Sequence, residues 1–569
     1  MQEQLVLKNR EWDPLAVDAL VADKVPEWLA RLYASRGISE AAQIVPRPQD
    51  LPVPALMKNL TMMATEIVDM YRRNKKILVV GDYDCDGATA SAIMTRGLQQ
   101  VGIPIQFLVP HRFEHGYGLT PEVVRQALER KPDLIITVDC GISSFDGIEV
   151  ARQAGVPVFV TDHHLPGDTL PDVLIVNPNQ PGCTFPSRNL CGAGVALYVV
   201  RAVRDELVKQ GVFTRATLPP VNALFSWVAI GTIADVVGLD WVNRGLVAYG
   251  LDSIRRGMGG PGIQALISVA GKRQSMLSTT DIAFGLGPRI NAAGRMASMD
   301  ASVNLLLDNG EDATRLAHEL DTLNKERRVV EGDMAAQAEV QAANYLADPA
   351  KVTLVAFEPE WHQGVIGIVA GRLKEKHWRP TVALAAIDDG QMKGSARSIP
   401  GLHLRDCLAR VDQLHPGLLL KFGGHSAAAG LTLRAGGLEL FRQAFEKVAR
   451  EMLTDEDLTR VMWSDGALPS EALSLEGASL LNDGLWGQAM PAPMFVDQVV
   501  VKDKRVLMDK ISGEPRHLKL RVSIRGIEMD AIWFNQAELN TDQPVLAYQL
   551  SINEYRGIVS PQLMIQGQF

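Results

Sequence analysis

The chain has 569 residues, of which 47% are hydrophobic and 22% charged, a composition typical of a multidomain globular protein and not of a disordered one. Its formal net charge of −9 excludes a globally basic nucleic-acid-binding protein, so any polyanion site has to be a local patch. The polar beginning MQEQLVLKNREWDP differs from a secretory signal peptide, and no apolar run approaches the ~20 residues that a membrane span needs.

The first half of the chain alternates strand-like and helical patterns. Residues 1–50 are expected to form a small helical lead-in that ends in the proline-rich stretch VPRPQDLPVP. Within 51–312, helical stretches separate the β-rich runs KKILVV, PIQFLVP, DLIITVDC, VPVFVTDHH and VLIVNP. Strands that alternate with helices predict a mostly parallel sheet with right-handed crossovers.

Three further regions are expected after residue 312. Uninterrupted helical spacing over 314–346 predicts one long connecting helix at 313–347. A second α/β region follows at 348–455 and opens with the strand VTLVAF. Residues 456–569 contain several short strands with the spacing of a small, OB-like β-barrel. The predicted fold class is therefore multidomain α/β with a C-terminal β-barrel.

Acidic residues follow the first of these strands. In GDYDCDG, Asp82, Asp84 and Asp86 alternate after the run ILVV, as in the beginning of an EF-hand calcium loop. That loop needs a preceding helix and a glutamate at its twelfth position, whereas this chain has a predicted strand and Ile93. For this segment alone, a βα turn with capping aspartates stays an alternative.

Three more segments bring similar residues. Asp139 follows the strand of ITVDC, and TDHHLPG places Asp162, His163 and His164 after the next strand. The apolar run FSWVAIGTIADVVGL, expected to be a strand with some helical character, places Asp235 after another. The carboxyl ends of parallel strands meet at one edge of a sheet, so these side chains are expected to converge there.

A cluster of this composition predicts a metal site. Carboxylates that are packed together repel one another unless a cation neutralises them. Oxygen ligands with one imidazole suit Mn²⁺ or Mg²⁺, and this many carboxylates favour two ions that share a bridging aspartate. Two such ions form the clamp used for phosphodiester hydrolysis.

These motifs carry a family resemblance. The set GDYDCDG, VDCG, TDHH and GTIADVVGL resembles, in order, the four motifs of the DHH phosphoesterase superfamily. The stretches QGVIGIVAGRL, KGSARS and KFGGHSAAAG resemble its DHH-associated second domain. The resemblance covers nearly the whole chain and is closest to the bacterial branch of exonucleases specific for single-stranded DNA.

The resemblance implies roles for individual residues. His164 is expected to face the scissile phosphate, and Asp162 to orient a histidine or the turn. Other members of the superfamily have a histidine where this chain has Val80, so ligation by Asp82 departs from the common pattern. The implied metal ligands are Asp82, Asp84, Asp86, the bridging Asp139, His163 and Asp235.

Candidate contacts to a nucleic-acid strand lie in the second α/β region. In KGSARS, Lys393, Ser395 and Arg397 are expected just after a strand and offer donors to phosphate. GGHSAAAG is expected to be a glycine turn that begins an alanine-rich helix, with the N–H groups of Gly424 and His425 at its positive end. A tight turn without a ligand is an equal alternative.

Two further groups come from the first α/β region. By resemblance, Arg289, Asn291 and Arg295 of GPRINAAGRM line the substrate channel and contact phosphates. HRFEHGYGL offers Arg112, His115 and Tyr117 for phosphate contact or base stacking, with ordinary packing an equal alternative for the tyrosine.

The β-rich tail is locally basic. Between Lys502 and Arg525 there are eight Lys or Arg residues against three acids, on strands that alternate apolar and basic residues. With Trp533 and Phe534 nearby, this pattern favours an oligonucleotide-binding fold with a basic groove and stacking platforms. A solvated charged face is the alternative.

The sequence therefore predicts a metal-dependent 5′-to-3′ exonuclease that releases mononucleotides from single-stranded DNA in repair and recombination. Polarity and strand preference come from the resemblance alone. Alternatives are a DHH phosphodiesterase that acts on short oligonucleotides or cyclic dinucleotides, and a non-catalytic single-strand-binding module. The resemblance also implies a single-strand-binding protein and a helicase as partners. We expect a monomer, and five cysteines without CxxC spacing favour reduced thiols and a cytoplasmic location.

Overall fold

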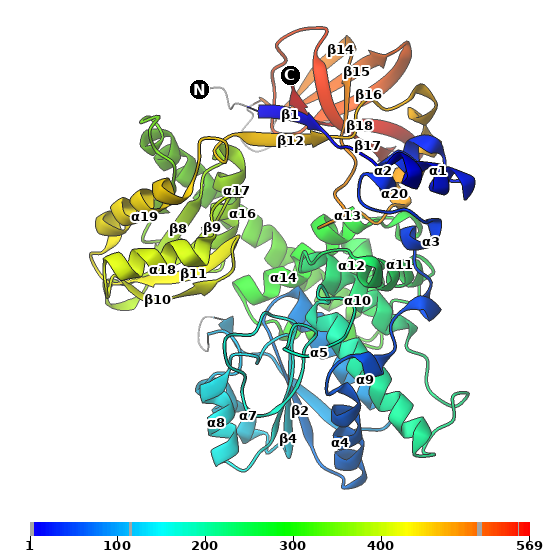
Figure 1. Cartoon of the computed structure of the whole chain (residues 1–569), viewed down its shortest axis with the longest axis vertical. Helices are drawn as coiled ribbons and strands as arrows, with labels where there is room; N and C mark the ends of the chain where they lie inside the picture. The colour runs from blue at the N-terminus through cyan, green and yellow to red at the C-terminus, as the bar shows by residue number, and fades with distance from the viewer. Residues whose placement is uncertain (1–4, 113–115, 509–514, 556) are drawn as a thin grey trace. The chain divides into compact units, whose positions relative to one another are not determined.

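The computed structural model describes residues 5–112, 116–508, 515–555 and 557–569 (Figure 1). The chain divides into two units. The first contains Thr322–Met462 together with the strand residues up to Lys8, and the second contains Asn9–Asp321 and Trp463–Phe569. Both units are thus discontinuous in sequence, and Thr322–Met462 of the first is inserted between the two parts of the second. The division into five regions expected from the sequence stays a prediction.

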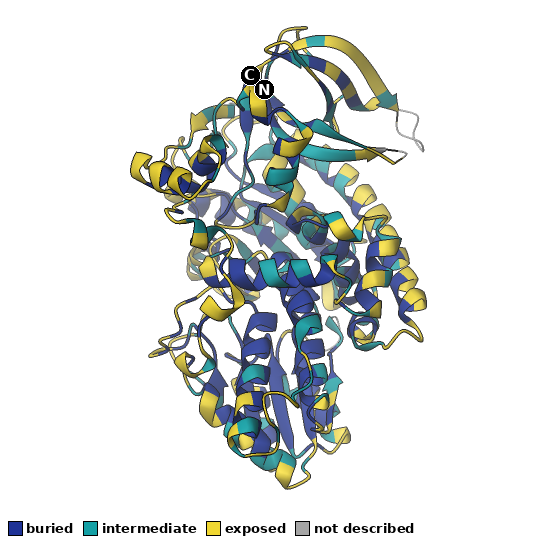
Figure 2. Cartoon of the chain, turned by 90° about the vertical axis from the view of Figure 1, so that its right-hand side faces the viewer, coloured by how far each residue is buried: buried dark blue, intermediate teal, exposed yellow. Residues whose placement is uncertain are grey.

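A parallel sheet forms the centre of the first α/β region, as predicted. Its strands are β2 (Ile77–Gly81), β3 (Ile105–Leu108), β4 (Leu134–Val138), β5 (Val158–Thr161) and β6 (Leu174–Val176). The spatial order is β3-β2-β4-β5-β6, and every pair is parallel. All residues of β2, β4 and β5 are buried, because helices cover both faces of the sheet (Figure 2).

The helices of this region cover the two faces separately. One face packs against α7 and α8, whose apolar residues join those of the strands in one core cluster. The other face carries α4, α5 and α9, of which α9 contacts both α4 and α5 (Figure 1). The helices are α4 (Leu60–Arg72), α5 (Cys85–Gln99), α7 (Pro121–Glu129), α8 (Phe145–Gln153) and α9 (Gly192–Lys209).

The run FSWVAIGTIADVVGL forms a helix, so the expectation of a strand before Asp235 was wrong. Helix α10 (Asn222–Ala234) is buried at every position from Leu224 to Ile233. An apolar run with no polar face gives no periodicity to tell a buried helix from a buried strand, and its length favours the helix. Further helices are α11 (Trp241–Arg255), α12 (Pro261–Val269), α13 (Thr279–Asp281), the π-helix η4 (Ile282–Leu286), α14 (Gly287–Met296) and α15 (Asp300–Leu307), with the short 3₁₀ turn η3 (Gln274–Met276).

The lead-in differs from the all-helical expectation, because it begins with a strand. Strand β1 (Leu5–Asn9) pairs with β12 (Arg460–Ser464). The helical part that follows consists of α1 (Pro14–Ala22), α2 (Glu27–Ala34), α3 (Ala41–Ile44) and the turns η1 (Pro48–Asp50) and η2 (Pro54–Leu56).

The long helix expected at 313–347 is present as α16 (Ala313–Tyr345). It leads into a five-stranded sheet of order β10-β11-β9-β8-β7, in which only β7 and β8 are parallel. The strands are β7 (Leu354–Phe357), β8 (Thr381–Ala386), β9 (Met392–Arg397), β10 (Leu419–Gly424) and β11 (Ala428–Leu433). The helices are α17 (Ile366–His377), α18 (Leu404–Leu414) and α19 (Leu438–Met452), with the turn η5 (Asp388–Gly390).

Two local predictions fail in this sheet. Lys393, Ser395 and Arg397 lie within β9 and not after a strand. The stretch GGHSAAAG forms the β10–β11 hairpin, so no helix begins there, and the N–H of His425 donates to the carbonyl of Ala428 at 2.8 Å. Pairing of β11 with both β9 and β10 overrides the helix propensity of its alanines.

The tail forms a six-stranded sheet of order β13-β17-β18-β16-β15-β14. All pairs are antiparallel except β16 with β18. The strands are β13 (Phe495–Gln498), β14 (Val500–Met508), β15 (Pro515–Ile524), β16 (Ile527–Trp533), β17 (Val545–Tyr555) and β18 (Ile558–Gln568). The turn η6 (Ser470–Ala472) and helix α20 (Leu475–Asp483) precede them.

Part of the basic charge of the tail is already paired. Arg521 lies 2.9 Å from Asp530, and Arg525 forms an ion pair with the buried Asp497. On the exposed side of β14 and β15, Arg505 and Lys519 stand opposite each other. The positive face is therefore smaller than the sequence count indicates.

A buried ion pair joins the lead-in to the tail. The guanidinium of Arg36 bonds both carboxylate oxygens of Asp465, at 2.8 and 3.0 Å, and the two side chains are only 1% and 2% exposed. Arg36 also lies over the ring of Trp486, which stacks on Tyr33. These contacts fix α2 against the segment that precedes the barrel.

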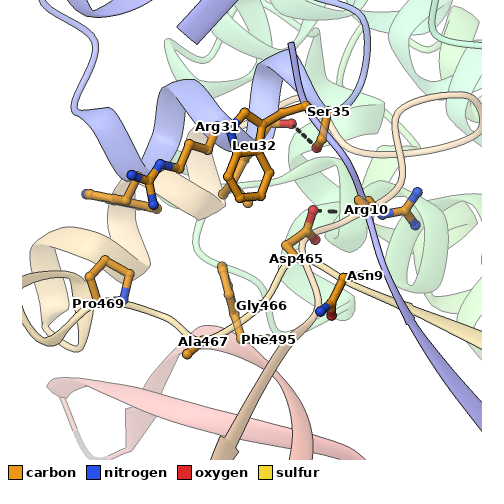
Figure 3. Close-up of a pocket in the computed structure, with 12 residues that line it drawn as sticks. Asn9, Arg10, Arg31, Leu32, Ser35, Asp465, Gly466, Ala467, Pro469 and Phe495 are labelled. Carbon is orange, nitrogen blue, oxygen red and sulfur yellow. Dashed lines mark hydrogen bonds and ion pairs between the residues drawn. The ribbon is translucent and has the colours of Figure 1, made fainter. Parts of the chain in front are cut away.

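A pocket of about 330 Å³ opens beside this ion pair (Figure 3). Arg10, Trp12 and Trp28 form part of its wall, and Arg10 Nε lies 3.8 Å from Asp465. None of the predicted metal ligands lines this pocket. Elsewhere, all five cysteines are buried free thiols, and no helix in the described ranges has the length and apolarity to cross a membrane.

Replacing Arg36 by leucine is expected to lower the free energy of unfolding by about 3–5 kcal/mol, because Asp465 would stay buried without its two guanidinium hydrogen bonds and with only the more distant Arg10 as a cationic neighbour. Thermal denaturation measures the change. The matched control is Arg256→Leu in the exposed pair with Asp252, which should leave the midpoint almost unchanged. Equal effects of the two substitutions would contradict the importance of burial.

Candidate metal centre

The loop between β2 and α5 holds the first three aspartates. Asp82 follows the strand, and Asp84 caps α5 by accepting the N–H groups of Asp86 and Gly87 at 2.9 and 3.1 Å. The side-chain oxygen of Asn291, on α14, accepts the N–H of Cys85 at 2.8 Å. A Cβ on Gly87 would clash with the backbone of Asp82, so glycine lets the helix start this close to the strand.

Asp86 points toward the beginning of α9. Its two carboxylate oxygens accept the N–H groups of Gly192 and Ala193 at 2.5 and 2.9 Å. Free N–H groups at the positive end of a helix favour a negative partner, so these two bonds favour the ionised carboxylate. Gly231 on α10 makes room, because a Cβ there would lie 2.8 Å from Asp86 Oδ1.

Asp139 occupies a strained position after β4. Its φ of 62° is in the left-handed region, which costs non-glycine residues on the order of 1–3 kcal/mol. Its N–H donates to the carbonyl of Thr161 at 3.0 Å, which fixes the turn. The residue after the last ligand, Val236, is also left-handed at 59°. Backbone strain therefore occurs at one predicted ligand and directly after another.

Asp162, expected from the sequence to orient a histidine or the turn, bonds the backbone of both histidines and the ring of His164. Its Oδ1 accepts the N–H groups of His163 and His164 at 2.7 and 3.0 Å and contacts His164 Nδ1 at 2.8 Å. Its Oδ2 accepts the N–H of Ile142 at 2.9 Å. Because both oxygens of Asp162 accept hydrogen bonds, its carboxylate stabilises the turn that carries the two histidines.

All seven residues predicted for catalysis and metal binding converge at the carboxyl edge of the sheet. His163 Nε2 lies 3.1 Å from Asp139 Oδ1, 3.6 Å from Asp235 Oδ2 and 3.8 Å from Asp86 Oδ2. Three groups have possible ligand atoms within 4.8 Å of one another: Asp82–Asp84–Asp139, Asp86–His163–Asp235 and Asp139–His163–His164. Asp139 belongs to two of these groups and adjoins the third through its 3.1 Å contact with His163.

The carboxylates of this cluster oppose one another electrostatically. Burial, with the charge of Asp84, raises the pKa of Asp82 to about 8. Burial and neighbouring carboxylates also raise the pKa of Asp86, Asp139 and Asp235. A raised pKa means that the ionised forms are unfavourable together in the protein alone.

The buried atoms of the cluster fit divalent cations. Four of them have no hydrogen-bond partner among the described residues: Asp82 Oδ1, Asp139 Oδ1, His163 Nε2 and Asp235 Oδ2. Buried polar atoms nearly always have partners, so several exceptions at one point fit a bound cation. Oxygen atoms with one imidazole are the donors that Mn²⁺ and Mg²⁺ accept.

His164 differs from its neighbour. Although burial opposes its charged form, the hydrogen bond and charge of Asp162 raise the pKa of His164 to about 9. Burial and the charge of His164 lower the pKa of His163, which suits a neutral metal ligand. The hydroxyl of Tyr117 lies 3.2 Å from His164 Nε2, which places this tyrosine at the centre.

Sequence reasoning missed Tyr83, which lies between two of the aspartates. Its ring packs edge-on against Tyr117, and the guanidinium of Arg112 lies 4.6 Å from its centre. Arg112 thus borders the cluster through Tyr83, whereas Tyr117 also contacts His164 directly. Its position inside the DYDCD motif was the available signal. His115 lies outside the described residues.

The residues of α14 have supporting contacts. Arg289 is buried and bonds Asp321 at 2.9 Å and the carbonyl of Gly285 at 2.7 Å. Asn291 anchors the aspartate loop, and Arg295 is half-buried on the same helix. The structure brings Asn291 to the centre, whereas the side chain of Arg289 is directed into an ion pair.

The remaining candidates lie in the first unit. Arg397 donates to the hydroxyl of Ser395 at 3.1 Å, and Lys393 lies on the same strand. Gly367, in the first turn of α17, is close to both Ser395 and Arg397. Gly424 and His425 form the β10–β11 turn. A hydroxyl, a guanidinium and a helix beginning together are an arrangement that suits an anion.

Known families match three parts of the chain: the DHH family N-terminal domain at 76–232, the DHHA1 domain at 350–451 and the RecJ OB domain at 464–567. The fold and centre thus define a protein of the DHH class with an OB domain.

Individual relatives identify the family within this class to which the chain belongs. The chain is 45% identical to the "Single-stranded-DNA-specific exonuclease RecJ" of Escherichia coli over 99% of both chains, and 42% identical to that of Haemophilus influenzae over 94% and 95%. The crystal structure of RecJ in complex with Mn²⁺ from Thermus thermophilus matches with a TM-score of 0.83 at 30% identity, covering 100% of this chain and 80% of that one. The chain belongs to the RecJ family.

Without metal, the protein is expected to lose thermal stability as the pH rises toward about 8. The pKa of Asp82 is about 8 in the folded protein, against an ordinary value of about 3.9 when unfolded. Between these values the folded state holds a proton that the unfolded state has released, so the free energy of unfolding falls with rising pH. Melting curves in EDTA across this range measure the effect.

Mn²⁺ should reverse the trend, because it binds the ionised carboxylates and its stabilising effect grows as they lose protons. In Asp82→Asn, one titrating group is gone, so the EDTA profile should be shallower. If the melting temperature in EDTA rises with pH, and does so equally in the wild type and in Asp82→Asn, this electrostatic explanation is wrong.

Proposed function

We propose that this protein is a metal-dependent exonuclease that degrades single-stranded DNA from its 5′ end and releases 5′-mononucleotides. Membership of the RecJ family and the carboxylate–histidine cluster support the reaction. Relatives that are 42–45% identical are described as specific for single-stranded DNA. The observation that carries the proposal is the convergence of seven side chains from four chain segments on one buried point.

The cofactor would be two divalent ions, Mn²⁺ or Mg²⁺. Asp82, Asp84 and Asp139 would hold one ion, and Asp86, His163 and Asp235 the other, with Asp139 between them. Bound ions would supply a nucleophile from water and neutralise charge on the phosphodiester. Known RecJ structures from Thermus thermophilus contain Mn²⁺ or Mg²⁺.

The other residues of the centre would position the substrate. Asp162 fixes the ring of His164, which faces the scissile phosphate in this proposal, and the hydroxyl of Tyr117 lies against the same ring, 3.3 and 3.2 Å from its two nitrogens. Arg112 and Tyr83 would contact the neighbouring nucleotide. Arg295 and Asn291 on α14 and Lys393, Ser395, Arg397, Gly424 and His425 in the first unit are the proposed phosphate contacts.

The wider context is also part of the proposal. The OB domain would bind single-stranded DNA through its basic side, and a single-strand-binding protein and a helicase would act with the enzyme in repair and recombination. We also propose that the protein is a monomer and is located in the cytoplasm.

Asp139→Ala should abolish Mn²⁺-dependent release of mononucleotides, because it removes the ligand shared by both groups. Asp18→Ala, which removes an exposed carboxylate on α1 outside the cluster, is the matched control and should keep wild-type turnover. Nuclease activity that survives both Asp139→Ala and EDTA, after contamination is excluded, would refute the metal mechanism. A wild type that binds the strand with Mn²⁺ but never cuts it would be a binding module.

Polarity is tested separately with matched strands labelled at the 5′ or 3′ end. The 5′ label should appear first as mononucleotide, and a hairpin that blocks the 5′ end should stop digestion. Early loss of the 3′ label refutes the polarity. Faster turnover of a dinucleotide than of a long strand would favour the phosphodiesterase of short substrates.

A further inference from the structure

The helical turn that leads into α14 presents an exposed phenylalanine. Phe284 lies in the π-helix η4 directly before α14, and the residue is 75% exposed. A single exposed apolar side chain needs no function by itself. Two features distinguish Phe284 from other exposed apolar residues: its position in the helix and the cause of the π-turn.

The π-turn has an identifiable cause in the sequence. The N–H of Gly287 donates to the carbonyl of Ile282, five residues earlier. Pro288 follows; it has no N–H, and in a regular α-helix its ring would clash with the carbonyl of Phe284. A single π-turn relieves this clash, and such turns are frequent at functional sites.

Phe284 shares a helix face with residues of the centre. The less buried positions of η4 and α14 include Phe284, Pro288, Asn291 and Arg295, a spacing of four, three and four residues. That spacing places them on one side of a helix. Asn291 on this side bonds the aspartate loop, so Phe284 shares a side of the helix with a residue that contacts the loop of the metal ligands.

Close backbone contacts hold the helix in this place. A Cβ on Gly294 would clash with the carbonyl of Tyr83, and one on Gly287 would lie 3.2 Å from Ala234, the residue before Asp235. Both ends of α14 are therefore fixed to segments that carry metal ligands. Phe284 lies about one helical turn before Gly287, and its π-helix directly precedes a helix whose two ends are both held in place.

We propose that Phe284 is a stacking platform for a nucleobase of the strand, a few nucleotides from the scissile phosphate. Seven residues separate it from Asn291, or about 10 Å along the helix axis, which is roughly three stacked nucleotides. An exposed aromatic ring offers a face to any base without reading its sequence. This inference rests on the proposed action on single-stranded DNA.

The test measures KM on strands with and without bases. Phe284→Ala should raise KM for a single strand by about 5-fold to 150-fold, the range of one lost base stack, with little change in kcat. Phe284→Trp should restore the wild-type value. Leu15→Ala, which truncates a residue 78% exposed on α1, is the matched control and should have no effect.

Abasic nucleotides placed one at a time along the strand identify the contact. At one position near the 5′ end, the missing base should raise KM of the wild type, and Phe284→Ala should add nothing further. The proposal is wrong if Phe284→Ala leaves KM unchanged. It is also wrong if the increase in KM caused by Phe284→Ala is the same on every abasic strand. Equal melting temperatures exclude a folding defect. A wild type that is inert with Mn²⁺ would instead refute the proposed function.

Discussion

Repulsion between buried carboxylates is the constraint on which the rest of the structure depends. Asp82 and Asp86, from the β2–α5 segment, meet Asp139 and Asp235, from two other segments, at one place where burial and like charge oppose their ionisation. The fold supplies partial compensation through the N–H groups at the beginning of α9 and the nearby histidines. Bound cations would neutralise the remaining repulsion between the carboxylates. Metal binding and the stability of the fold are therefore thermodynamically linked.

Close backbone approach makes this arrangement possible. Gly87, Gly192, Gly231 and Gly294 each lie where a side chain would collide with a ligand or with its loop. They come from four helices that surround the cluster. The glycines therefore determine how near the carboxylates come, while the strands determine the edge of the sheet at which they meet.

The sequence was sufficient for the parallel sheet, the long helix and the convergence of six of the seven side chains, because strand ends in a parallel sheet point to one edge, whereas Asp235 reaches the same point from the end of a helix. It was insufficient for α10, whose apolar run has no periodicity, and for the β10–β11 hairpin, where pairing overrides alanine propensity. Contacts such as Asn291 with Cys85 and Asp86 with Gly192 join residues 206 and 106 positions apart, and no local pattern predicts such distant partners.

The ion pair of Arg36 with Asp465 has a consequence for biosynthesis. The two residues are 429 positions apart in the chain. At translation rates of about 5–20 residues per second, the ribosome needs roughly 20–90 seconds to deliver the partner of Arg36 after making it. Helix α2 therefore waits without its final neighbours while the inserted unit is synthesised, and the nascent chain closes this contact late.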